Sequence, residues 1–382
     1  MHDVVIVGAG PVGLFLGVLL LQQGRDVRIL EQRSERSTHS RAIGIHPPAL
    51  AALALAGVAD SLVSEGVHIG QGLARSGGET VAALRFDRAN PACPFVLTIP
   101  QARTEELLEE RVRALDPAAL VRGAAVTTVH DDGGCVTVTT SPPAGSGTSR
   151  GGVYQGRLVI GADGAHSAVR RALGIPTRGR NYPDSYVMGD FPDTGSDGAV
   201  AVLYLEPGGI VESFPLPGGL RRWVVHTDAL LDGVSAVDLA RLIRDRTGVA
   251  VDAAENSMLS AFGVRGRLTL RMVAGRTALI GDAAHEISPI GGQGMNLGWL
   301  DAAALAPIID AALRGGRTGG RLEQFERTRM AAARAAMWQA WLNMALGRPQ
   351  PASLLAVRHK VVRLIFRARW VQDFVARRFS MQ

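Results

Sequence analysis

Two glycine-rich segments lie near opposite ends of the chain, and their residue types suit close contact between backbone and ligand. Residues 8–13 read GAGPVG, and residues 289–296 read PIGGQGMN shortly after the pair Gly281-Asp282. Because glycine has no side chain, such a backbone can approach a phosphate or a flat ring that a larger residue would exclude. The two segments therefore indicate separate contact points for one long ligand.

The first segment lies in a complete βαβ unit of about thirty residues. Residues 4–7 predict a buried strand, and Pro11 suits the first turn of a helix that continues to residue 21. Residues 27–30 predict a second strand, which ends at Glu31. In such a unit the helix N-terminus holds a pyrophosphate and the acid binds a ribose hydroxyl. The unit predicts dinucleotide binding, and with the distant second segment it favours FAD held along its whole length.

Composition limits the class of protein. The 382 residues, 47% hydrophobic and 20% charged, are typical of a soluble globular protein with one large or two ordinary domains. Lys360 is the only lysine among 41 basic residues, and the formal net charge is +6. The arginines are interleaved with acids and no nucleic-acid recognition motif accompanies them, so we expect no nucleic-acid partner. An anionic cofactor and substrate account for the charge equally well.

The remaining compositional signals are negative. Cys93 and Cys135 are far apart and form no CxxC, so we expect two reduced thiols, and we identify no set of metal ligands. Residues 4–21 are apolar enough to resemble a signal peptide or a membrane span. They lack a basic leading region and contain the nucleotide turn, so we expect a cytoplasmic protein.

The middle of the chain has a different character. Alternating or apolar runs at residues 200–205, 210–216 and 222–227 are separated by Pro and Gly turns and predict a β-meander. Upstream, residues 141–152 predict an exposed hairpin loop between strands near 134–140 and 153–160. A sheet domain therefore interrupts the nucleotide-binding domain, which resumes near residue 265.

A third motif completes the set. Residues 158–170, LVIGADGAHSAVR, predict a buried strand, an Asp-Gly turn and a helix that carries Arg170 and Arg171. The order GxGxxG, GADGxxSxVR and GDAAHxxxPxGGQGMNxG resembles the FAD-dependent aromatic-ring hydroxylases, the p-hydroxybenzoate-hydroxylase-like class A flavoprotein monooxygenases. The resemblance runs from residue 3 to residue 345.

The resemblance implies an α/β fold in which a Rossmann-like FAD-binding domain is interrupted by a β-sheet substrate domain and followed by C-terminal helices. The expected boundaries are 1–70, 97–176 and 265–345 for the FAD-binding domain, 71–96 and 177–264 for the substrate domain, and 346–382 for the helical segment.

The resemblance also assigns cofactor contacts. The first motif would hold the pyrophosphate and Glu31 the ribose, Arg41 would meet the phosphates and Gln101 the flavin side of the cofactor, and Asp282 would bind the ribitol hydroxyls. Asp163 belongs to the motif that the family links to both FAD and NAD(P)H. The full expected set is Gly8, Gly10, Pro11, Val12, Gly13, Glu31, Gln32, Arg33, Arg41, Gln101, Asp163, Gly164, Gly281, Asp282, Pro289, Gly291, Gly292, Gly294, Met295 and Asn296.

Residues 291–296 have a physical reason to face the flavin. A helix that begins near Gly294 directs free N–H groups and a positive dipole end at the negative charge that reduced flavin carries on its pyrimidine edge. Other residues are weaker candidates for the active site. They are His46, Pro289 and Gly291 beside the flavin, and Tyr204, Ser213 and Trp223 on the sheet, where alternation places only half of the residues on the inner face. His285 is expected to be structural, and Glu286 to be a solvated loop residue.

The implied activity is monooxygenation with NADH or NADPH and O2. Reduced FAD would form a C4a-hydroperoxide and hydroxylate an aromatic, phenolic or quinone-like compound, of the kind found in antibiotic biosynthesis. The alternatives are an FAD-dependent reductase or dehydrogenase of an isoprenoid or quinone, and a non-catalytic flavin-binding accessory protein. The protein could be a monomer or a homodimer.

The C-terminal segment carries an apolar stripe at helical spacing, flanked by basic residues. We expect a helix that closes over the FAD-binding domain, or else a basic helix in weak contact with a membrane surface. The apolar positions are Val357, Val361, Leu364, Ile365, Ala368, Val371 and Val375.

Overall fold

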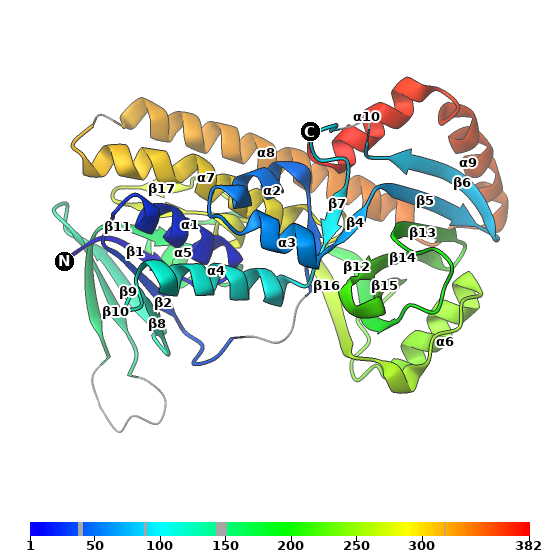
Figure 1. Cartoon of the computed structure of the whole chain (residues 1–382), viewed down its shortest axis with the longest axis horizontal. Helices are drawn as coiled ribbons and strands as arrows, with labels where there is room; N and C mark the ends of the chain where they lie inside the picture. The colour runs from blue at the N-terminus through cyan, green and yellow to red at the C-terminus, as the bar shows by residue number, and fades with distance from the viewer. Residues whose placement is uncertain (37–40, 88–89, 143–150, 317) are drawn as a thin grey trace.

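The computed structural model describes residues 1–36, 41–87, 90–142, 151–316 and 318–382. Two eight-stranded sheets lie at opposite ends of the molecule, and the long helix α8 (Gly319–Gly347) runs along both (Figure 1). The first sheet has the order β17-β18-β11-β1-β2-β8, with β10 and β9 continuing from β11. Its strands are β1 (His2–Val7), β2 (Val27–Glu31), β8 (Leu120–Arg122), β9 (Val126–Asp131), β10 (Val136–Thr140), β11 (Val153–Gly161), β17 (Val273–Ala274) and β18 (Thr277–Leu279).

The first βαβ unit forms as predicted. Strand β1 pairs in parallel with β2 and with β11, and helix α1 (Pro11–Gln22) connects β1 to β2. This helix is apolar on every side, and it is buried between α4 (Gln101–Leu115) and α7 (Gln293–Leu313). Among the described helices, α7 alone is long and apolar enough to span a membrane, and most of it is buried inside the fold.

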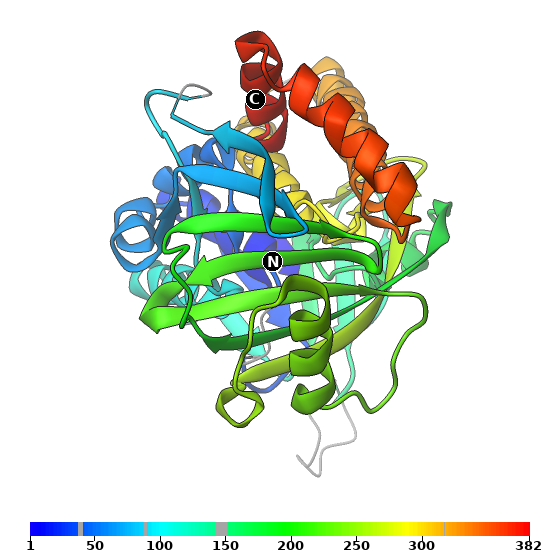
Figure 2. The same cartoon turned by 90° about the vertical axis from the view of Figure 1, so that its right-hand side faces the viewer.

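The second sheet has the order β19-β16-β12-β15-β14-β13-β5-β6. The predicted meander is confirmed, because β13, β14 and β15 pair antiparallel in sequence order. Helix α6 (Ala236–Thr247) covers one face of this sheet (Figure 2). The strands are β5 (Gln71–Ser76), β6 (Glu79–Arg85), β12 (Thr177–Pro192), β13 (Val200–Glu206), β14 (Gly209–Leu216), β15 (Leu220–Thr227), β16 (Met258–Thr269) and β19 (His285–Glu286).

Strands from distant parts of the sequence meet in this sheet. Strand β5 pairs in parallel with β13, which joins the segment after residue 70 to the meander. At the other edge β16 pairs with β19, so this strand crosses the expected boundary at residue 265. A small sheet of β3 (Gly44–Ile45), β7 (Val96–Thr98) and β4 (Val67–Ile69), with α2 (Pro47–Ala54) and α3 (Ala59–Glu65) between β3 and β4 in the chain, completes this region. Thr98 links it to β14 by donating a hydrogen bond to the Pro215 carbonyl at 2.7 Å.

The predicted hairpin near residue 140 is present, since β10 and β11 pair antiparallel. Residues 143–150 of its loop lie outside the described part of the chain.

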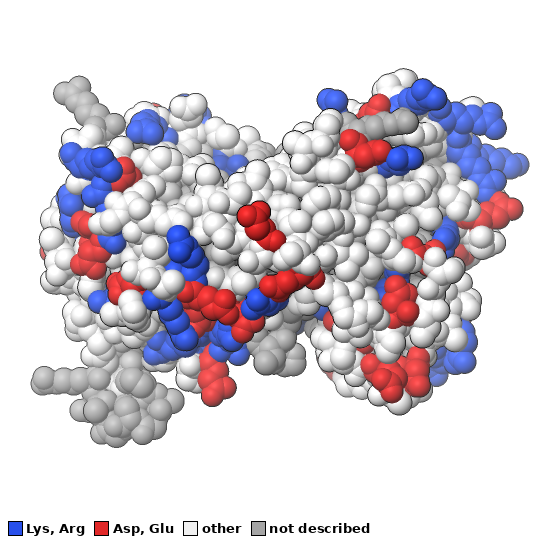
Figure 3. Space-filling view, in the orientation of Figure 1, with Lys and Arg blue, Asp and Glu red and all other residues white. Residues whose placement is uncertain are grey.

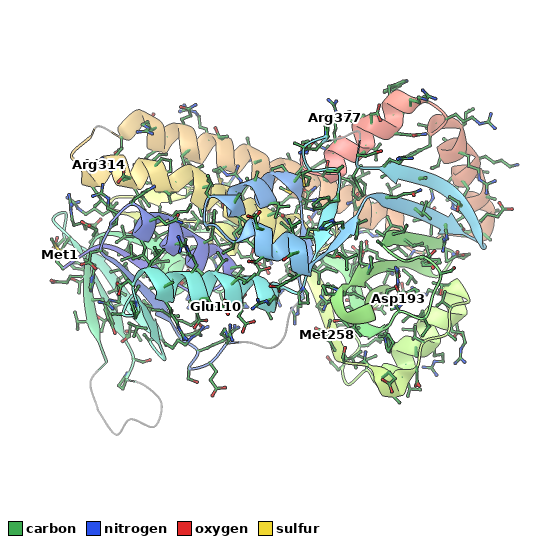
Figure 4. All side chains as sticks on the ribbon, in the orientation of Figure 1. Met1, Glu110, Asp193, Met258, Arg314 and Arg377 are labelled. Carbon is green, nitrogen blue, oxygen red and sulfur yellow. The ribbon has the colours of Figure 1, made fainter. Side chains whose placement is uncertain are left out.

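The C-terminal segment differs from the prediction. It forms two helices, α9 (Ala352–Ile365) and α10 (Arg369–Phe379), which follow the 29-residue helix α8 (Gly319–Gly347). Both pack against β6 of the second sheet, so the expected helix over the FAD-binding domain is wrong. Figure 4 shows Arg377 of α10 on the same side of the molecule as Asp193 and Met258, with Arg314 at the opposite end.

Candidate cofactor and substrate site

A cavity of about 1380 Å³ extends from the glycine loop after β1 to the second sheet and to α8, α9 and α10. Pockets for a single drug-sized ligand are typically about 300–1,000 Å³. This cavity therefore has room for a dinucleotide together with a substrate.

The glycine loop after β1 forms an open cradle at the N-terminus of α1. Among the described residues, Gly10 is the N-cap residue, no side chain caps the helix, and a Cβ placed on Gly10 would have no atom within 4 Å. The flanking glycines, in contrast, are closely surrounded by backbone atoms. A Cβ at Gly8 would lie 2.4 Å from the Ala162 carbonyl oxygen, and one at Gly13 would lie 2.0 Å from that of Gly8. The loop thus packs tightly behind the cavity and leaves its free N–H groups facing an anion site.

Glu31 stands beside this cradle at the end of β2. Its Oε2 accepts a hydrogen bond from the Ala9 N–H at 2.8 Å, and its Oε1 accepts one from the Arg33 N–H at 3.0 Å. These two bonds fix the carboxylate next to the loop, at the place where a Rossmann fold holds a ribose.

A second cradle lies at the N-terminus of α7. Gly291 has φ 98° and the N-cap Gly292 has φ 66°, conformations that glycine adopts most readily, and no side chain caps the helix. The first N–H groups of α7 are thus uncapped beside Met295, which lines the cavity. Such a helix end favours negative charge in front of it.

Asn296 has a different role from the one expected. Its side chain is fully buried, and its Oδ1 accepts a hydrogen bond from the His46 N–H at 2.8 Å. Its Nδ2 donates to the carbonyls of Gly44 at 2.9 Å and Gly292 at 2.7 Å. Asn296 therefore holds the β3 loop against the start of α7 instead of lining the cavity.

Asp163 lines the cavity from the turn after β11. Its Oδ2 caps α5 (Ala168–Ala172) by accepting hydrogen bonds from the N–H groups of Ala168 at 2.7 Å and Val169 at 3.1 Å. Its Oδ1 is buried and has no hydrogen-bond partner among the described residues. The free oxygen leaves one acceptor for a bound ligand.

His285 is structural, as expected, and it belongs to a buried charge network. Its Nε2 lies 2.5 Å from Oδ2 of Asp301, which also accepts the Gly281 N–H at 3.0 Å. Nε of Arg329 donates to the other carboxylate oxygen at 2.6 Å. Burial alone would lower the pKa of His285, but the neighbouring charge of Asp301 raises it. The network ties α7 and α8 to the loop that carries Asp282.

Asp282 itself opens into the cavity. Enclosure by the protein raises the pKa of its carboxyl to about 6, and the nearby Glu286 and Asp301 carboxylates add to the effect. Glu286 lines the cavity too, which differs from the solvated position expected for it.

Replacing Asp282 by alanine is expected to weaken FAD retention about 10- to 100-fold, because it removes charge-assisted hydrogen bonds of about 1.5–3 kcal/mol each. The fold should survive, since no described residue donates a hydrogen bond to this carboxylate. Fluorescence titration of the stripped protein with FAD measures the affinity, and the melting temperature of the flavin-free protein is the control. Unchanged affinity would contradict the assignment.

The substrate half of the cavity is formed by one face of the second sheet. Leu203 and Leu205 of β13, Ile210 and Phe214 of β14, and Val224 of β15 line it. The three sheet candidates occupy the alternate positions of these strands, so their side chains point to the other face of the sheet. Tyr204 and Trp223 pack under α6, and Ser213 is fully buried and accepts a hydrogen bond from Arg221 at 3.1 Å. Because successive side chains of a strand point to opposite faces, the candidates Tyr204, Ser213 and Trp223 lie on the other face of the sheet and do not line this cavity.

One carboxyl stands among these apolar side chains. Glu212 lies between Ile210 and Phe214 on the cavity face of β14, is 8% exposed, and its carboxyl forms no hydrogen bond or ion pair with another described residue. Burial raises its pKa to about 7. The buried arginine of the same face is fully paired, since Arg222 donates to both carboxylate oxygens of Asp190 at 2.7 Å. Glu212 is thus the polar group of this wall that is left for a ligand.

His46 lies where the cofactor and substrate halves meet. It lines the cavity beside Gly291 and Gly292, and its Nδ1 has no hydrogen-bond partner among the described residues. Burial lowers its pKa to about 4, so the ring is neutral at physiological pH. As a neutral ring it can donate or accept a hydrogen bond without placing charge in the cavity.

The cavity gathers nearly all of the expected cofactor residues. Gly13 and Asn296 lie behind its surface, while Arg265, Trp338 and Gln339, which no motif indicated, line it from distant elements. The expected residues that line it are Gly8, Gly10, Pro11, Val12, Glu31, Gln32, Arg33, Arg41, Gln101, Asp163, Gly164, Gly281, Asp282, Pro289, Gly291, Gly292, Gly294 and Met295.

Comparison with known proteins agrees with this geometry. The sequence model of the FAD binding domain family matches residues 1–340. The chain is 31% identical over 336 residues to a rifampicin monooxygenase of Streptomyces venezuelae, covering 86% of this chain and 68% of that protein. It is also 31% identical over 368 residues to a 12-dehydrotetracycline 5-monooxygenase/anhydrotetracycline 6-monooxygenase of Streptomyces rimosus, covering 92% of this chain and 71% of that protein.

Solved structures give the same result. The crystal structure of p-nitrophenol 4-monooxygenase from Pseudomonas putida superposes with a TM-score of 0.87 at 25% identity, over 98% of this chain and 96% of that one. An anhydrotetracycline hydroxylase from Streptomyces rimosus superposes with a TM-score of 0.80 at 28% identity, over 100% of this chain and 76% of that one.

The chain belongs to the FAD-binding family of aromatic-compound monooxygenases. It is an FAD-dependent monooxygenase. The two open helix N-termini, the acid at the end of β2 and the unpartnered Asp163 oxygen fit a long anionic dinucleotide, so the residues present suit FAD.

Proposed function

We propose that the protein hydroxylates a large, largely apolar aromatic, phenolic or quinone-like compound of secondary metabolism, with NADH or NADPH as the source of electrons and O2 as the source of oxygen. The observation that carries the proposal is the single cavity that runs from the two glycine cradles to the apolar face of the second sheet. The relatives include a rifampicin monooxygenase and an anhydrotetracycline monooxygenase, and their names support a substrate of this kind.

FAD, when bound, supplies electron transfer and oxygen activation. The chain supplies position and environment. The α1 and α7 N-termini would hold the pyrophosphate and the pyrimidine edge of the flavin, Asp282 the ribityl chain, and Glu31 the ribose. The apolar walls of the second sheet exclude water from the reacting atoms, which strengthens each remaining polar contact.

Glu212 would orient the substrate through a hydroxyl group. A carboxylate in an apolar wall accepts a hydrogen bond from a phenol, and such a bond to a charged group is worth about 1.5–3 kcal/mol. With its pKa raised to about 7, the carboxyl changes from donor and acceptor to pure acceptor within the physiological pH range.

The affinity of the FAD-loaded protein for anhydrotetracycline is therefore expected to rise as the pH increases through about 7. Glu212→Gln should remove that step and weaken binding about tenfold or more at pH 8. Quenching of flavin fluorescence measures the affinity, and Glu255→Gln, on the exposed surface, is the matched control. If the affinity of wild type and Glu212→Gln had the same pH dependence, Glu212 would not be a substrate contact.

The stability of the substrate-free protein gives a second test of Glu212. A raised pKa means that the folded state binds the proton more tightly, so stability decreases as the pH rises from about 4.3 to about 7. Glu212→Gln is expected to melt at a higher temperature than wild type above pH 7 and at nearly the same temperature below pH 4.

Isotope labelling tests the reaction. With NAD(P)H and isotopically labelled oxygen gas, one labelled atom is expected in the product of anhydrotetracycline or a smaller phenol, together with matched consumption of reductant and oxygen. A product without label, formed while NAD(P)H is consumed, would replace this proposal by the reductase or dehydrogenase alternative. Binding of FAD without turnover of any reductant would favour the accessory-protein alternative.

A further inference from the structure

We propose that α9 and α10 form a docking surface for anionic lipid, which places the mouth of the substrate cavity against a bilayer. We call these two helices, with the residues that follow them to the end of the chain, the C-terminal helix pair (residues 352–382). The docking surface is independent of the proposed function, whereas delivery of an apolar substrate through it rests on that function.

Charge separates the C-terminal helix pair from the rest of the chain. It has seven basic residues and the single acid Asp373, an excess of +6. This equals the formal net charge of all 382 residues, so the rest of the chain is neutral. Figure 3 shows blue side chains gathered over this corner of the molecule. The basic residues are Arg358, Lys360, Arg363, Arg367, Arg369, Arg377 and Arg378.

The basic side chains are mostly free to meet an external anion. Within the described ranges, Arg363 alone among them forms an ion pair, with Glu79 of β6. Arg358 donates to the Leu346 carbonyl at 2.7 Å, and Arg378 stacks over the ring of Trp338. Lys360, Arg367 and Arg369 are exposed. Each basic residue near an anionic membrane surface adds favourable binding energy.

Exposed apolar side chains lie on the same two helices. Trp370 is 73% exposed and Leu364 is 66% exposed, values unusual for such large apolar residues. Basic residues beside an exposed stripe of aliphatic and aromatic residues are typical of helices that lie in the membrane interface. The large apolar side chains exposed on this pair are Leu354, Val357, Val361, Leu364, Ile365, Trp370 and Phe374.

The charge selects lipid over a second copy of the chain. Two copies that met through these faces would bring +6 against +6, and like charges at an interface are costly. An anionic bilayer provides both the apolar layer for the stripe and the negative charge for the arginines. The observations therefore favour a lipid surface as the occupant.

The helix pair also forms part of the cavity wall. Val362 and Phe366 of α9, and Phe374 and Val375 of α10, line the cavity together with residues of the second sheet. Phe374 is at the same time 64% exposed, so the apolar lining continues to the outer surface. A hydrophobic substrate dissolved in a bilayer would thus reach the cavity without crossing water.

Vesicle co-sedimentation of the full-length, FAD-loaded protein tests the proposal without turnover. Vesicles of phosphatidylcholine and phosphatidylglycerol in equal amounts are expected to bind the protein at least about tenfold more strongly than phosphatidylcholine alone. Binding should fall steeply with added salt, because salt screens exposed charges. Absence of binding to both vesicles, or equal binding to both, would overturn the proposal, whatever reaction the enzyme catalyses.

Two variants locate the surface. Combined Lys360→Glu, Arg367→Glu and Arg369→Glu, and separately Trp370→Ser, are expected to reduce vesicle binding at least about tenfold. The matched control replaces Arg321, Arg327 and Arg334, three exposed arginines of α8, by glutamate in the same way. It should bind to vesicles as wild type does. The flavin spectrum and melting temperature verify folding. A dimer that Trp370→Ser converts to a monomer, without vesicle binding, would show that a second copy is the occupant.

Discussion

Gly10→Val is expected to produce a folded protein that no longer retains FAD. Gly10 has φ −74° and ψ −179°, an extended conformation that valine adopts readily, and a Cβ there meets no protein atom within 4 Å. The added side chain would instead occupy the cradle in front of α1, where the pyrophosphate approaches the backbone. Loss of two or more charge-assisted hydrogen bonds, each worth about 1.5–3 kcal/mol, predicts at least about a hundredfold weaker binding.

Gly13→Ala provides the contrast within the same motif. Its Cβ would lie 2.0 Å from the Gly8 carbonyl oxygen, so this variant is expected to lose stability of the fold itself. Absorbance of the bound flavin and the melting temperature of the flavin-free protein separate the two effects. Gly10→Val that purifies yellow, with wild-type affinity, would show that the cradle is not the pyrophosphate site.

Asp301→Ala is expected to have the largest effect on stability. The residue is fully buried and is the partner of His285 and Arg329, so its removal leaves the buried His285 ring and the largely buried Arg329 guanidinium without their carboxylate. Breaking a buried ion pair in this way costs about 3–5 kcal/mol. The Gly281 N–H loses its acceptor as well, so the loop that carries Asp282 should loosen and FAD affinity should fall.

Asp310→Ala on the same helix is the control for Asp301→Ala. Asp310 pairs with Arg25 and Arg314 near the surface, where ion pairs contribute little, so the melting temperature should barely change. Thermal melting of both variants decides the matter. A similar melting temperature for Asp301→Ala and wild type would contradict the structural role of the network.

The network also predicts a pH dependence. The charges of His285 and Arg329 lower the pKa of Asp301 in spite of its burial, so the stability from this carboxylate is present above about pH 3.9 and is lost on further acidification. The pKa of His285 is raised, so its contribution is complete below about pH 6.5 and decreases as the pH rises through the raised value. Wild type and Asp301→Ala should therefore differ most between these limits.

The sequence was sufficient for the elements whose signals are local. The βαβ unit, the meander and the hairpin at β10 and β11 each depend on a strand or helix period and on Gly or Pro at turns, which a short window of sequence contains. Most of the cofactor half of the site followed for the same reason, since most of its residues come from three glycine-containing motifs, while Arg41 and Gln101 were expected from the family resemblance.

The substrate half could not be predicted in this way. On β13 and β14 the choice between Tyr204 and Leu205, or between Ser213 and Glu212, depends on which face of the sheet α6 covers, and that is decided by long-range packing. The docking of α9 and α10 on β6 has the same origin. Their apolar stripe is visible in the sequence, but its partner lies more than two hundred residues away.

The shared cavity has a thermodynamic consequence. Because the glycine cradles and the apolar wall of β14 open into one space, an occupant of one half contacts or excludes the occupant of the other half. Binding free energies coupled in this way are reciprocal, so a substrate that binds more tightly to the FAD-loaded protein must raise the equilibrium affinity for FAD by the same factor.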